Sequence, residues 1–265
     1  MIATKTPKTP LPTLNFSKFE GKASVDQIHG YQQKIGSLNF AAVTTRPDIS
    51  YSISKLSEFL QNPGPIHIHA ADHLLIYLAA TKDYSITFDG KTKESKIFLT
   101  WSDSSYADDV ETRYSSAGFC LQLYGGTIHY KATKIKTVVT SSTHAELLSL
   151  SQTAKELQWW KRFFKNLGFD LEQDPAIHCD NKQTIRLLES ESSRLRTNLK
   201  HIDVHQCWLR QEVKSGNIRL IWVPTTDMVA DGFTKLLPPQ RHNAFVNQLG
   251  LKFSGAGPEN KSTQS

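Results

Sequence analysis

The chain lacks the features that define several classes of protein. It has 3 cysteines in 265 residues, Cys120, Cys179 and Cys207, which are too few and of odd number for a disulfide framework. No run of apolar residues is long enough to predict a membrane-spanning helix. The first residues contain neither an apolar core nor arginine, so neither a secretory signal nor a mitochondrial presequence is predicted. These absences predict an intracellular protein, of the cytoplasm or nucleus, with no membrane partner.

Neither sign of charge dominates the chain. Its 31 Lys+Arg residues oppose 25 Asp+Glu residues, for a formal net charge of +6. The basic residues gather in two stretches, 125–165 and 194–219, whereas acidic residues gather at 103–111 and 170–180. This segregation is typical of a face that binds a polyanion around an acidic site, although solvated helix faces would also explain either basic stretch taken alone.

The pattern of apolar residues divides the chain into four parts. Residues 1–24 and 254–265 are rich in Pro, Ser, Thr and Lys and are predicted to be flexible tails. Residues 25–95 have helical spacing interrupted by prolines and predict a small helical segment. Residues 96–253 predict the order β-β-β-α-β-α-α-β-α. The expected fold class is therefore α/β, with a mixed five-stranded sheet flanked by helices and preceded by the helical segment.

Three local expectations can be checked directly. One helix should bury a single face, formed by Tyr31, Ile35, Leu38, Phe40 and Ala42. Strands 118–124 and 127–130 should be joined by a two-residue turn at Gly125-Gly126. Residues 226–249 should form one helical region near the end of the chain.

Four acidic residues stand at the ends of predicted elements. Asp103 ends the first strand of the α/β part, and Asp180 follows the fourth. Glu146 lies in the first turn of a long helix, and Asp231 lies near the start of the last helical region. If the first and fourth strands are neighbours, Asp103 and Asp180 lie side by side and offer the oxygen ligands that a hard divalent cation prefers. Two cations about 3.5–4 Å apart would then suit hydrolysis of a phosphodiester.

Each of these acids also has a local explanation. Glu146 could complete a capping box with Thr143, and Asp180 could cap the helix that follows it. Asp231 could favour a helix dipole, and Asp103 could be a turn residue. Taken singly the acids are therefore weak signals; their joint order on this succession of elements is a stronger one.

A set of collinear short motifs carries a resemblance to a known family. From about residue 30 to residue 251 the chain resembles the C-terminal part of copia-type retrotransposon polyproteins, in which the end of the reverse transcriptase is followed by a type 1 ribonuclease H domain. The motifs are Ile35-Gly-Ser-Leu-Asn-Phe, Thr45-Arg-Pro-Asp-Ile-Ser-Tyr, Trp101-Ser-Asp-Ser-Ser-Tyr-Ala-Asp-Asp, Arg113-Tyr-Ser-Ser-Ala-Gly, Ser141-Ser-Thr-His-Ala-Glu, Cys179-Asp-Asn, Lys200-His-Ile-Asp-Val-His, Val223-Pro-Thr-Thr and Ala230-Asp-Gly-Phe-Thr-Lys.

The resemblance implies an activity, a cofactor and a set of site residues. It implies endonucleolytic cleavage of the RNA strand of an RNA–DNA hybrid with two Mg²⁺ ions, for which Mn²⁺ could substitute. The catalytic and metal-binding residues would be Asp103, Glu146, Asp180 and Asp231, with Asp103 bridging the ions. The hybrid is the expected partner, together with the remainder of a reverse transcriptase. Phosphates of the hybrid could be held by six basic residues: Lys131, Lys134, Lys136, Arg194, Arg196 and Lys200.

Other functions agree less well with the sequence. An inactive or domesticated retroelement remnant, which binds nucleic acid without cleaving it, is the main alternative. Tyr106-Ala-Asp-Asp109 spells a polymerase signature, but it lies directly after Asp103 and the upstream palm motifs are missing, so no polymerase activity is expected. The pairs His69/His73 and His201/His205 have the helical spacing of metal ligands, and packing explains each of them better.

Overall fold

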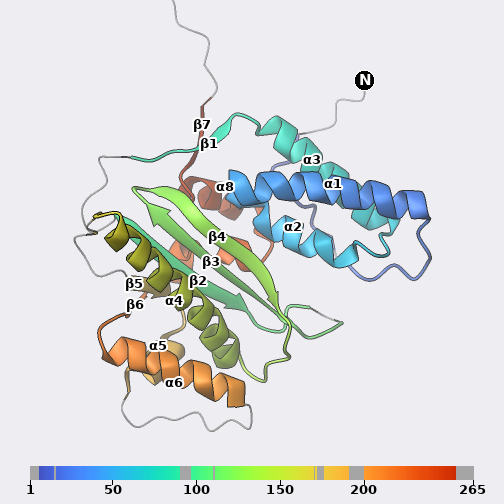
Figure 1. Cartoon of the computed structure of the whole chain (residues 1–265). Coiled ribbons are helices and arrows are strands. Elements are labelled where there is room, and N and C mark those ends of the chain that lie inside the picture. Colours follow the sequence, from blue (N-terminus) through green and yellow to red (C-terminus); the bar gives the residue numbers. More distant parts are fainter. Residues whose placement is uncertain are drawn as a thin grey trace, which may run out of the picture.

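A five-stranded mixed sheet forms the centre of the molecule (Figure 1). The computed structural model describes residues 6–14, 16–89, 97–109, 111–169, 171, 176–190 and 200–254, without the side chains of residues 200–203. The sheet order is β4-β3-β2-β5-β6. Its strands are β2 (Phe98–Ser105), β3 (Ser115–Leu123), β4 (Gly126–Ile135), β5 (Ala176–Cys179) and β6 (Arg219–Trp222). The first three pair antiparallel, and β5 and β6 run parallel to β2, which confirms the predicted fold class.

The hairpin between β3 and β4 lies one residue earlier than predicted. Its two central residues are Tyr124 and Gly125, with φ of 48° and 79°, and Leu123 pairs with Gly126 across the turn. Positive φ at both positions matches the twist of the flanking strands. Gly126 belongs to the strand, where a Cβ atom would lie 2.7 Å from the Phe88 ring. The second glycine therefore serves packing rather than the turn.

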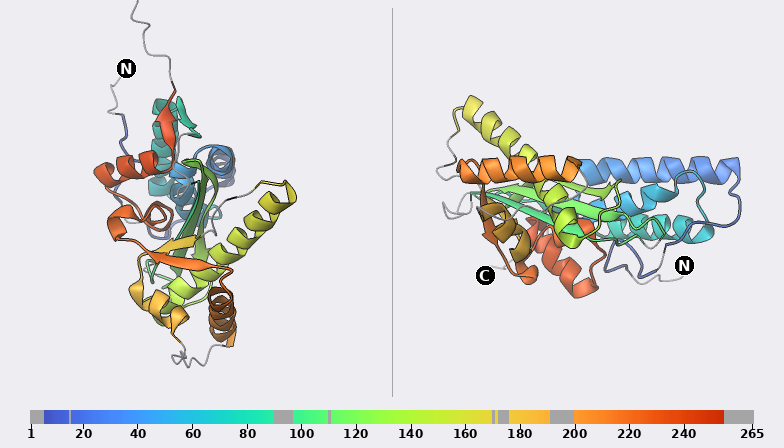
Figure 2. Two further views of the ribbon diagram at one scale, coloured as in Figure 1. Left: turned by 90° about the vertical axis from the view of Figure 1, so that its left-hand side faces the viewer. Right: turned by 90° about the horizontal axis from the view of Figure 1, so that it is seen from below.

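Helices cover both faces of the sheet. One face is covered by α4 (Ser142–Asn166), α5 (Lys182–Glu189) and α6 (Lys200–Lys214), and the other by α7 (Asp231–Thr234) and α8 (Pro239–Gln248) (Figure 2). Side chains alternate along β3, so that Phe119 and Leu121 pack under α4 whereas Cys120 packs under α7 and α8. Alternate residues of β3 thus contribute to the hydrophobic cores on the two faces of the sheet.

The region predicted as one helix over residues 226–249 is divided. It consists of the 3-10 turn η4 (Thr225–Asp227), then α7, then α8. Pro238 precedes α8 and Pro239 is its first residue; proline removes backbone donors and disfavours helix in the preceding residue, so a helix can begin here but not run through from α7. The interruption leaves α7 as a single turn over the carboxyl end of β2.

The helical segment packs beside the edge strand β4 (Figure 1). It contains α1 (Val25–Thr44), the 3-10 turn η1 (Pro47–Ile49), α2 (Ser50–Leu56), the 3-10 turn η2 (Ser57–Phe59) and α3 (Pro65–Ala80). The predicted face of α1 is buried except for Phe40, which is 70% exposed because it lies two positions from Leu38 and so on another side of the helix. Among the described helices, none combines the length and apolar character that crossing a membrane would need.

Part of the N-terminal stretch that composition predicts to be a flexible tail packs on the rest of the chain. The described residues 6–14 and 16–24, here called the N-terminal strap, lie against the helical segment and the β2–β3 loop. Leu11 is 1% exposed in the helical core, and Lys18 pairs with Glu111. The low-complexity composition concealed a few well-placed apolar side chains. Of the second predicted tail, residues 255–265 lie outside the described residues.

A second, two-stranded sheet was not predicted. It pairs β1 (Tyr84–Ile86) with β7 (Leu251–Phe253) in antiparallel register. Three-residue strands carry too little alternation to be recognised from sequence. This sheet ties the end of the helical segment to the last described residues of the chain.

Candidate active site

Asp103 lies within β2, near its carboxyl end. Its side chain is buried, and its Oδ2 accepts a hydrogen bond from the Thr234 hydroxyl of α7. The Ser149 hydroxyl of α4 donates to the backbone carbonyl of Asp103 at 2.8 Å. Helices on both faces of the sheet therefore fix this residue.

Asp180 follows β5 and lies beside Asp103. Trp101 of β2 pairs with His178 of β5 in parallel register, which brings the positions two residues further along each strand next to one another. The Thr225 hydroxyl donates to Asp180 Oδ2 at 3.0 Å, and the Trp222 indole donates to the Asp180 backbone carbonyl at 3.0 Å. The helix cap of α5 is Asn181 and not Asp180.

Glu146 projects from the second turn of α4 toward the same place. The cap of α4 is Ser141, whose hydroxyl accepts from the His144 amide at 3.2 Å, so the alternative capping box with Thr143 is not formed. The Ser104 hydroxyl donates to Glu146 Oε1 at 2.9 Å. Glu146 Oε2 is buried and has no hydrogen-bond partner in the described structure. This oxygen is therefore available to a cation or to a donor that binds at the site.

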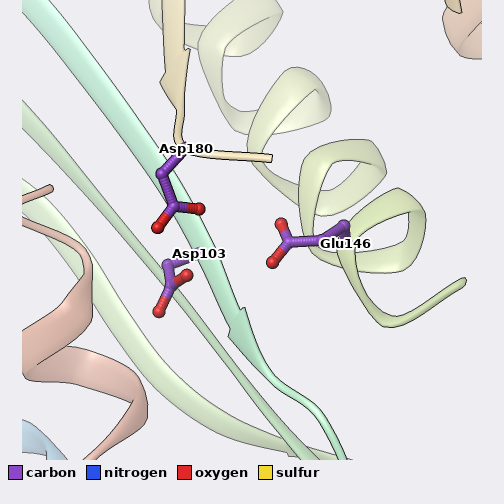
Figure 3. Close-up of side chains that lie close together, drawn as sticks. All are labelled: Asp103, Glu146 and Asp180. Atoms are coloured by element: carbon purple, nitrogen blue, oxygen red, sulfur yellow. The ribbon is translucent and has the colours of Figure 1, made fainter. Parts of the chain in front are cut away.

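These three carboxylates form one cluster at the carboxyl ends of β2 and β5 (Figure 3). Each offers one oxygen, and these oxygens all lie within 4.8 Å of one another; no other such group of possible metal ligands occurs among the described residues. Burial raises the pKa of Asp103 to about 7, and the charges of Asp231 and Asp180 add to this effect. Burial and the Asp103 charge raise the pKa of Glu146 well above its usual value. The cluster is therefore electrostatically unfavourable without a positive charge.

The fourth predicted acid lies next to the cluster but outside it. Asp231 begins α7, and its side chain is 2% exposed. Its Oδ1 pairs with Lys235 at 2.8 Å and its Oδ2 with Arg241 at 2.8 Å. Thr234 connects it to Asp103, since the Thr234 hydroxyl donates to both the Asp231 carbonyl and the Asp103 carboxylate.

The donor set fits a divalent cation such as Mg²⁺. All three clustered ligands are carboxylates, which hard cations prefer, and the unpartnered Glu146 Oε2 faces no competing donor in the described structure. In addition, one oxygen of each carboxylate accepts from a hydroxyl, that of Thr234, Ser104 or Thr225. Hydrogen bonds of this kind orient ligands and are typical around metal sites.

The predicted phosphate-binding residues are in different situations. Lys131 and Lys136 are exposed on β4 and just after it. Lys134, by contrast, pairs with Glu58 at 2.9 Å and with Asp109, so it joins the helical segment to the β2–β3 loop instead of facing solvent. Arg194 and Arg196 lie outside the described residues, as does the side chain of Lys200.

Five residues that share the site were not singled out from the sequence. They are Ser104, Thr225, Thr234, Lys235 and Arg241. The first four stand inside the motifs quoted above, so the motifs carried a signal for them. Arg241 stands outside every motif, and nothing in the sequence indicates that it reaches Asp231.

The other candidate motifs have structural roles. In the Tyr106–Asp109 stretch, Asp108 accepts from the Ser116 amide at 2.7 Å and Asp109 accepts from the Thr112 amide at 2.8 Å. Both acids therefore shape the loop between β2 and β3. Likewise His73 bonds the Thr9 carbonyl at 3.0 Å, and His205 bonds the Ser151 hydroxyl at 2.7 Å.

The sheet order and the carboxylate cluster define a protein with a ribonuclease H-like fold. No protein-family model matches the chain. The chain is 33% identical over 221 residues to the Pol polyprotein of transposon TNT 1-94 from Nicotiana tabacum, which covers 83% of the chain. It is also 33% identical over 252 residues to that of transposon RE1 from Arabidopsis thaliana, which covers 95% of it. The chain belongs to the Pol polyproteins of copia-type retrotransposons, as the motifs predicted.

The chain corresponds to a small part of these relatives. It spans 16% of the length of the tobacco polyprotein and 17% of that of the Arabidopsis one. Among solved structures, LC11-RNase H1 isolated from compost is similar, with a TM-score of 0.40 and 15% identity over 52% of this chain and 91% of that chain. The fold assignment itself rests on the order and direction of the strands.

Proposed function

We propose that the chain is a ribonuclease H that hydrolyses the RNA strand of RNA–DNA hybrids endonucleolytically with a divalent metal. The observation that carries this proposal is the convergence of Asp103, Glu146 and Asp180, together with the buried and unpartnered Glu146 Oε2. Membership of a polyprotein family that copies RNA into DNA supports the choice of a hybrid as substrate. Selection of RNA over DNA would depend on contacts to the 2′-hydroxyl groups.

The protein's own residues would hold the metal and the substrate in place. Asp103, Glu146 and Asp180 would be the metal ligands, and the hydroxyls of Thr234, Ser104 and Thr225 fix one oxygen of each. A bound Mg²⁺ or Mn²⁺ supplies Lewis-acid activation of water and charge stabilisation at the phosphate. Exposed Lys131 and Lys136 would bind backbone phosphates of the hybrid.

We further propose that residues 25–95 are the end of a reverse transcriptase and residues 96–253 the nuclease. In this view the helical segment would extend the surface along which the hybrid lies, and the remainder of a reverse transcriptase would be its partner. The alternative of a non-cleaving remnant is not favoured, because a chain without selection for cleavage has no reason to keep three converging carboxylates, two of which are buried.

The test is a cleavage assay with the purified full chain. A 5′-labelled RNA annealed to DNA is incubated with Mg²⁺, beside the Asp103→Asn, Asp180→Asn double variant and the wild type in EDTA. We expect internal cuts in the RNA strand with the wild type and Mg²⁺ only, and none in single-stranded RNA. Equal cutting by wild type and double variant would exclude the proposed site.

A further inference from the structure

This inference concerns Asp231, which forms ion pairs with two cations although its Oδ1 receives no hydrogen bond within the described residues. Lys235 lies 2.8 Å from Oδ1 and Arg241 lies 2.8 Å from Oδ2. The Asp231 side chain is 2% exposed, whereas those of Lys235 and Arg241 are 44% and 40% exposed. The acid is thus buried at the edge of the cluster, and its two partners reach it from solvent.

Burial explains why Asp231 needs these partners. An ionised carboxylate removed from water is costly unless a positive charge or several donors compensate it. The ammonium group of Lys235 pairs with Asp231, and its charge also opposes the rise that burial causes in the pKa of Asp103. A metal bound between Asp103 and Asp231 would have to displace it.

The formal charges indicate how many divalent ions the site accepts by itself. Four carboxylates with two paired cations leave a charge of about −2, which one divalent ion neutralises. A second divalent ion would give an excess of about +2 in a buried place. Only an anion such as a substrate phosphate would then restore the balance.

We propose that Lys235, assisted by Arg241, stands in the place of a second metal ion in the substrate-free protein. The free site then binds one divalent ion, on Asp103, Glu146 and Asp180, and a second enters only when a phosphate of the hybrid arrives and Lys235 moves aside. This inference rests on the proposed function and deepens it, because it makes Lys235 the residue that sets metal stoichiometry. It differs from the two-ion site that the family resemblance implies for the protein at rest.

The experiment counts bound Mn²⁺ without nucleic acid and without an activity readout. The full-length wild type, Lys235→Met and Lys235→Arg are titrated with Mn²⁺ and followed by electron paramagnetic resonance of the free ion, with calorimetry as a second measure. Lys182→Met is the matched control, because Lys182 lies over the Trp222 ring at 3.9 Å, two residues after Asp180, and is not among the ion-pair partners found for Asp231. Circular dichroism establishes that each variant is folded.

We expect one bound Mn²⁺ for the wild type, for Lys235→Arg and for Lys182→Met. Lys235→Met should bind a second ion at least tenfold more tightly than the wild type does, because a repelling charge is gone. Adding Asp231→Asn to Lys235→Met should reduce the number of bound Mn²⁺ ions to one again. Two ions in the wild type, or one in Lys235→Met, would overturn the role of Lys235.

The outcome is distinguishable from failure of the proposed function. A wild type that cleaves the hybrid but binds two ions at rest keeps the nuclease and loses the inference. A wild type that binds no ion and does not cleave loses both.

Discussion

The buried carboxylates of the cluster lower the stability of the folded protein. Asp103 is buried among other carboxylates, and burial raises its pKa to about 7. For a carboxyl whose pKa is raised by folding, the unfolded state loses its proton first, so stability is lost as the pH rises from the unfolded pKa through the folded pKa. At neutral pH the cluster therefore costs folding free energy, which a bound cation would return.

Asp103→Asn should for this reason stabilise the metal-free protein. Removing the buried charge while keeping an acceptor for Thr234 should raise Tm by about 2–4 °C, equivalent to about 1 kcal/mol. Mg²⁺ should raise the Tm of the wild type and leave that of the variant nearly unchanged. Differential scanning fluorimetry with and without Mg²⁺ measures both effects. Exposed Asp227→Asn serves as the control, and a drop in Tm for Asp103→Asn would contradict the account.

The sequence located the clustered acids better than it described their surroundings. Strand ends and short motifs were sufficient to select Asp103, Glu146 and Asp180, because local order along the chain decides which residues meet at the edge of a sheet. The state of Asp231 could not be predicted, since it depends on Arg241, which α8 brings in from ten residues away. Ion pairs of this kind form only once the helices are packed.

At the level of elements, contact between α7 and the sheet depends on one small residue. Gly118 of β3 is paired with Asp103, and a Cβ atom there would lie 2.5 Å from the Phe233 Cβ and 3.1 Å from the Phe233 backbone. Backbone cannot yield as a flexible side chain can, so α7 would have to move away from β3. The glycine of the Ser-Ser-Ala-Gly motif is thus explained by close approach.

Gly118→Ala should therefore damage both stability and the site. We expect a loss of about 1–3 kcal/mol in the free energy of unfolding, as for other overpacked sites, and a loss of cleavage because Thr234 and Asp231 move with α7. The matched control is Gly36→Ala in α1, where nothing lies within 4 Å and alanine favours the helix. Urea unfolding and the hybrid cleavage assay are the measurements. Unchanged cleavage by a destabilised Gly118→Ala would separate α7 from the chemistry.

Two lysines of β4 allow the electrostatic roles of this strand to be separated. Lys134 is enclosed in ion pairs with Glu58 and Asp109, whereas Lys131 is exposed. Lys134→Met should cost about 1 kcal/mol of stability, because Glu58 and Asp109 each lose one of the two lysines that pair with them and keep Lys55. The salt dependence of hybrid binding should not change. Lys131→Met should leave stability unchanged and reduce the salt slope by about 0.9 if it holds one phosphate.

The binding measurement is fluorescence anisotropy of a labelled hybrid at several NaCl concentrations, with Asp103→Asn as background to prevent cleavage. A salt slope that changes equally in both variants would show that Lys134 does reach the hybrid.

Sequence alone could not separate these lysines, because both stand in one basic stretch and only tertiary packing pairs one of them. Elements themselves were predictable where apolar periodicity was long, as in α4, and not where they were three residues long, as in β1 and β7.

At the scale of the whole molecule, buried polar groups join the helical segment to the nuclease part. Arg46 and Asp48 form a buried pair at 2.7 Å, and Asp48 also accepts from the Tyr77 hydroxyl at 2.8 Å. That hydroxyl lies 2.9 Å from His242 Nε2 in α8. The Arg-Pro-Asp motif, one of those that carry the family resemblance, therefore connects two parts of the chain, and no sequence pattern predicts that connection.

The N-terminal strap is attached by a histidine whose protonation state is determined by its contacts. His67 is fully buried; its Nδ1 accepts from the Gly64 amide at 2.9 Å, so the proton is on Nε2, which bonds the Ser17 carbonyl at 3.0 Å. Its ring stacks on Phe59 with centroids 3.7 Å apart. Burial lowers the pKa of His67, and protonation of Nδ1 would remove the bond from Gly64.

Stability should consequently fall in weak acid, in part through the strap. A histidine with a lowered folded pKa binds fewer protons when folded, so its contribution is complete above the unfolded pKa of about 6.5 and is lost as the pH falls below it. We expect the urea midpoint to decrease between pH 7 and pH 5, and less steeply in His67→Gln, which can accept from Gly64 and donate to Ser17 without titrating. Exposed His69→Gln, two residues away, should retain the wild-type pH dependence. An equal slope in all three proteins would show that the strap is not held through His67, and that the other buried histidines carry the acid sensitivity.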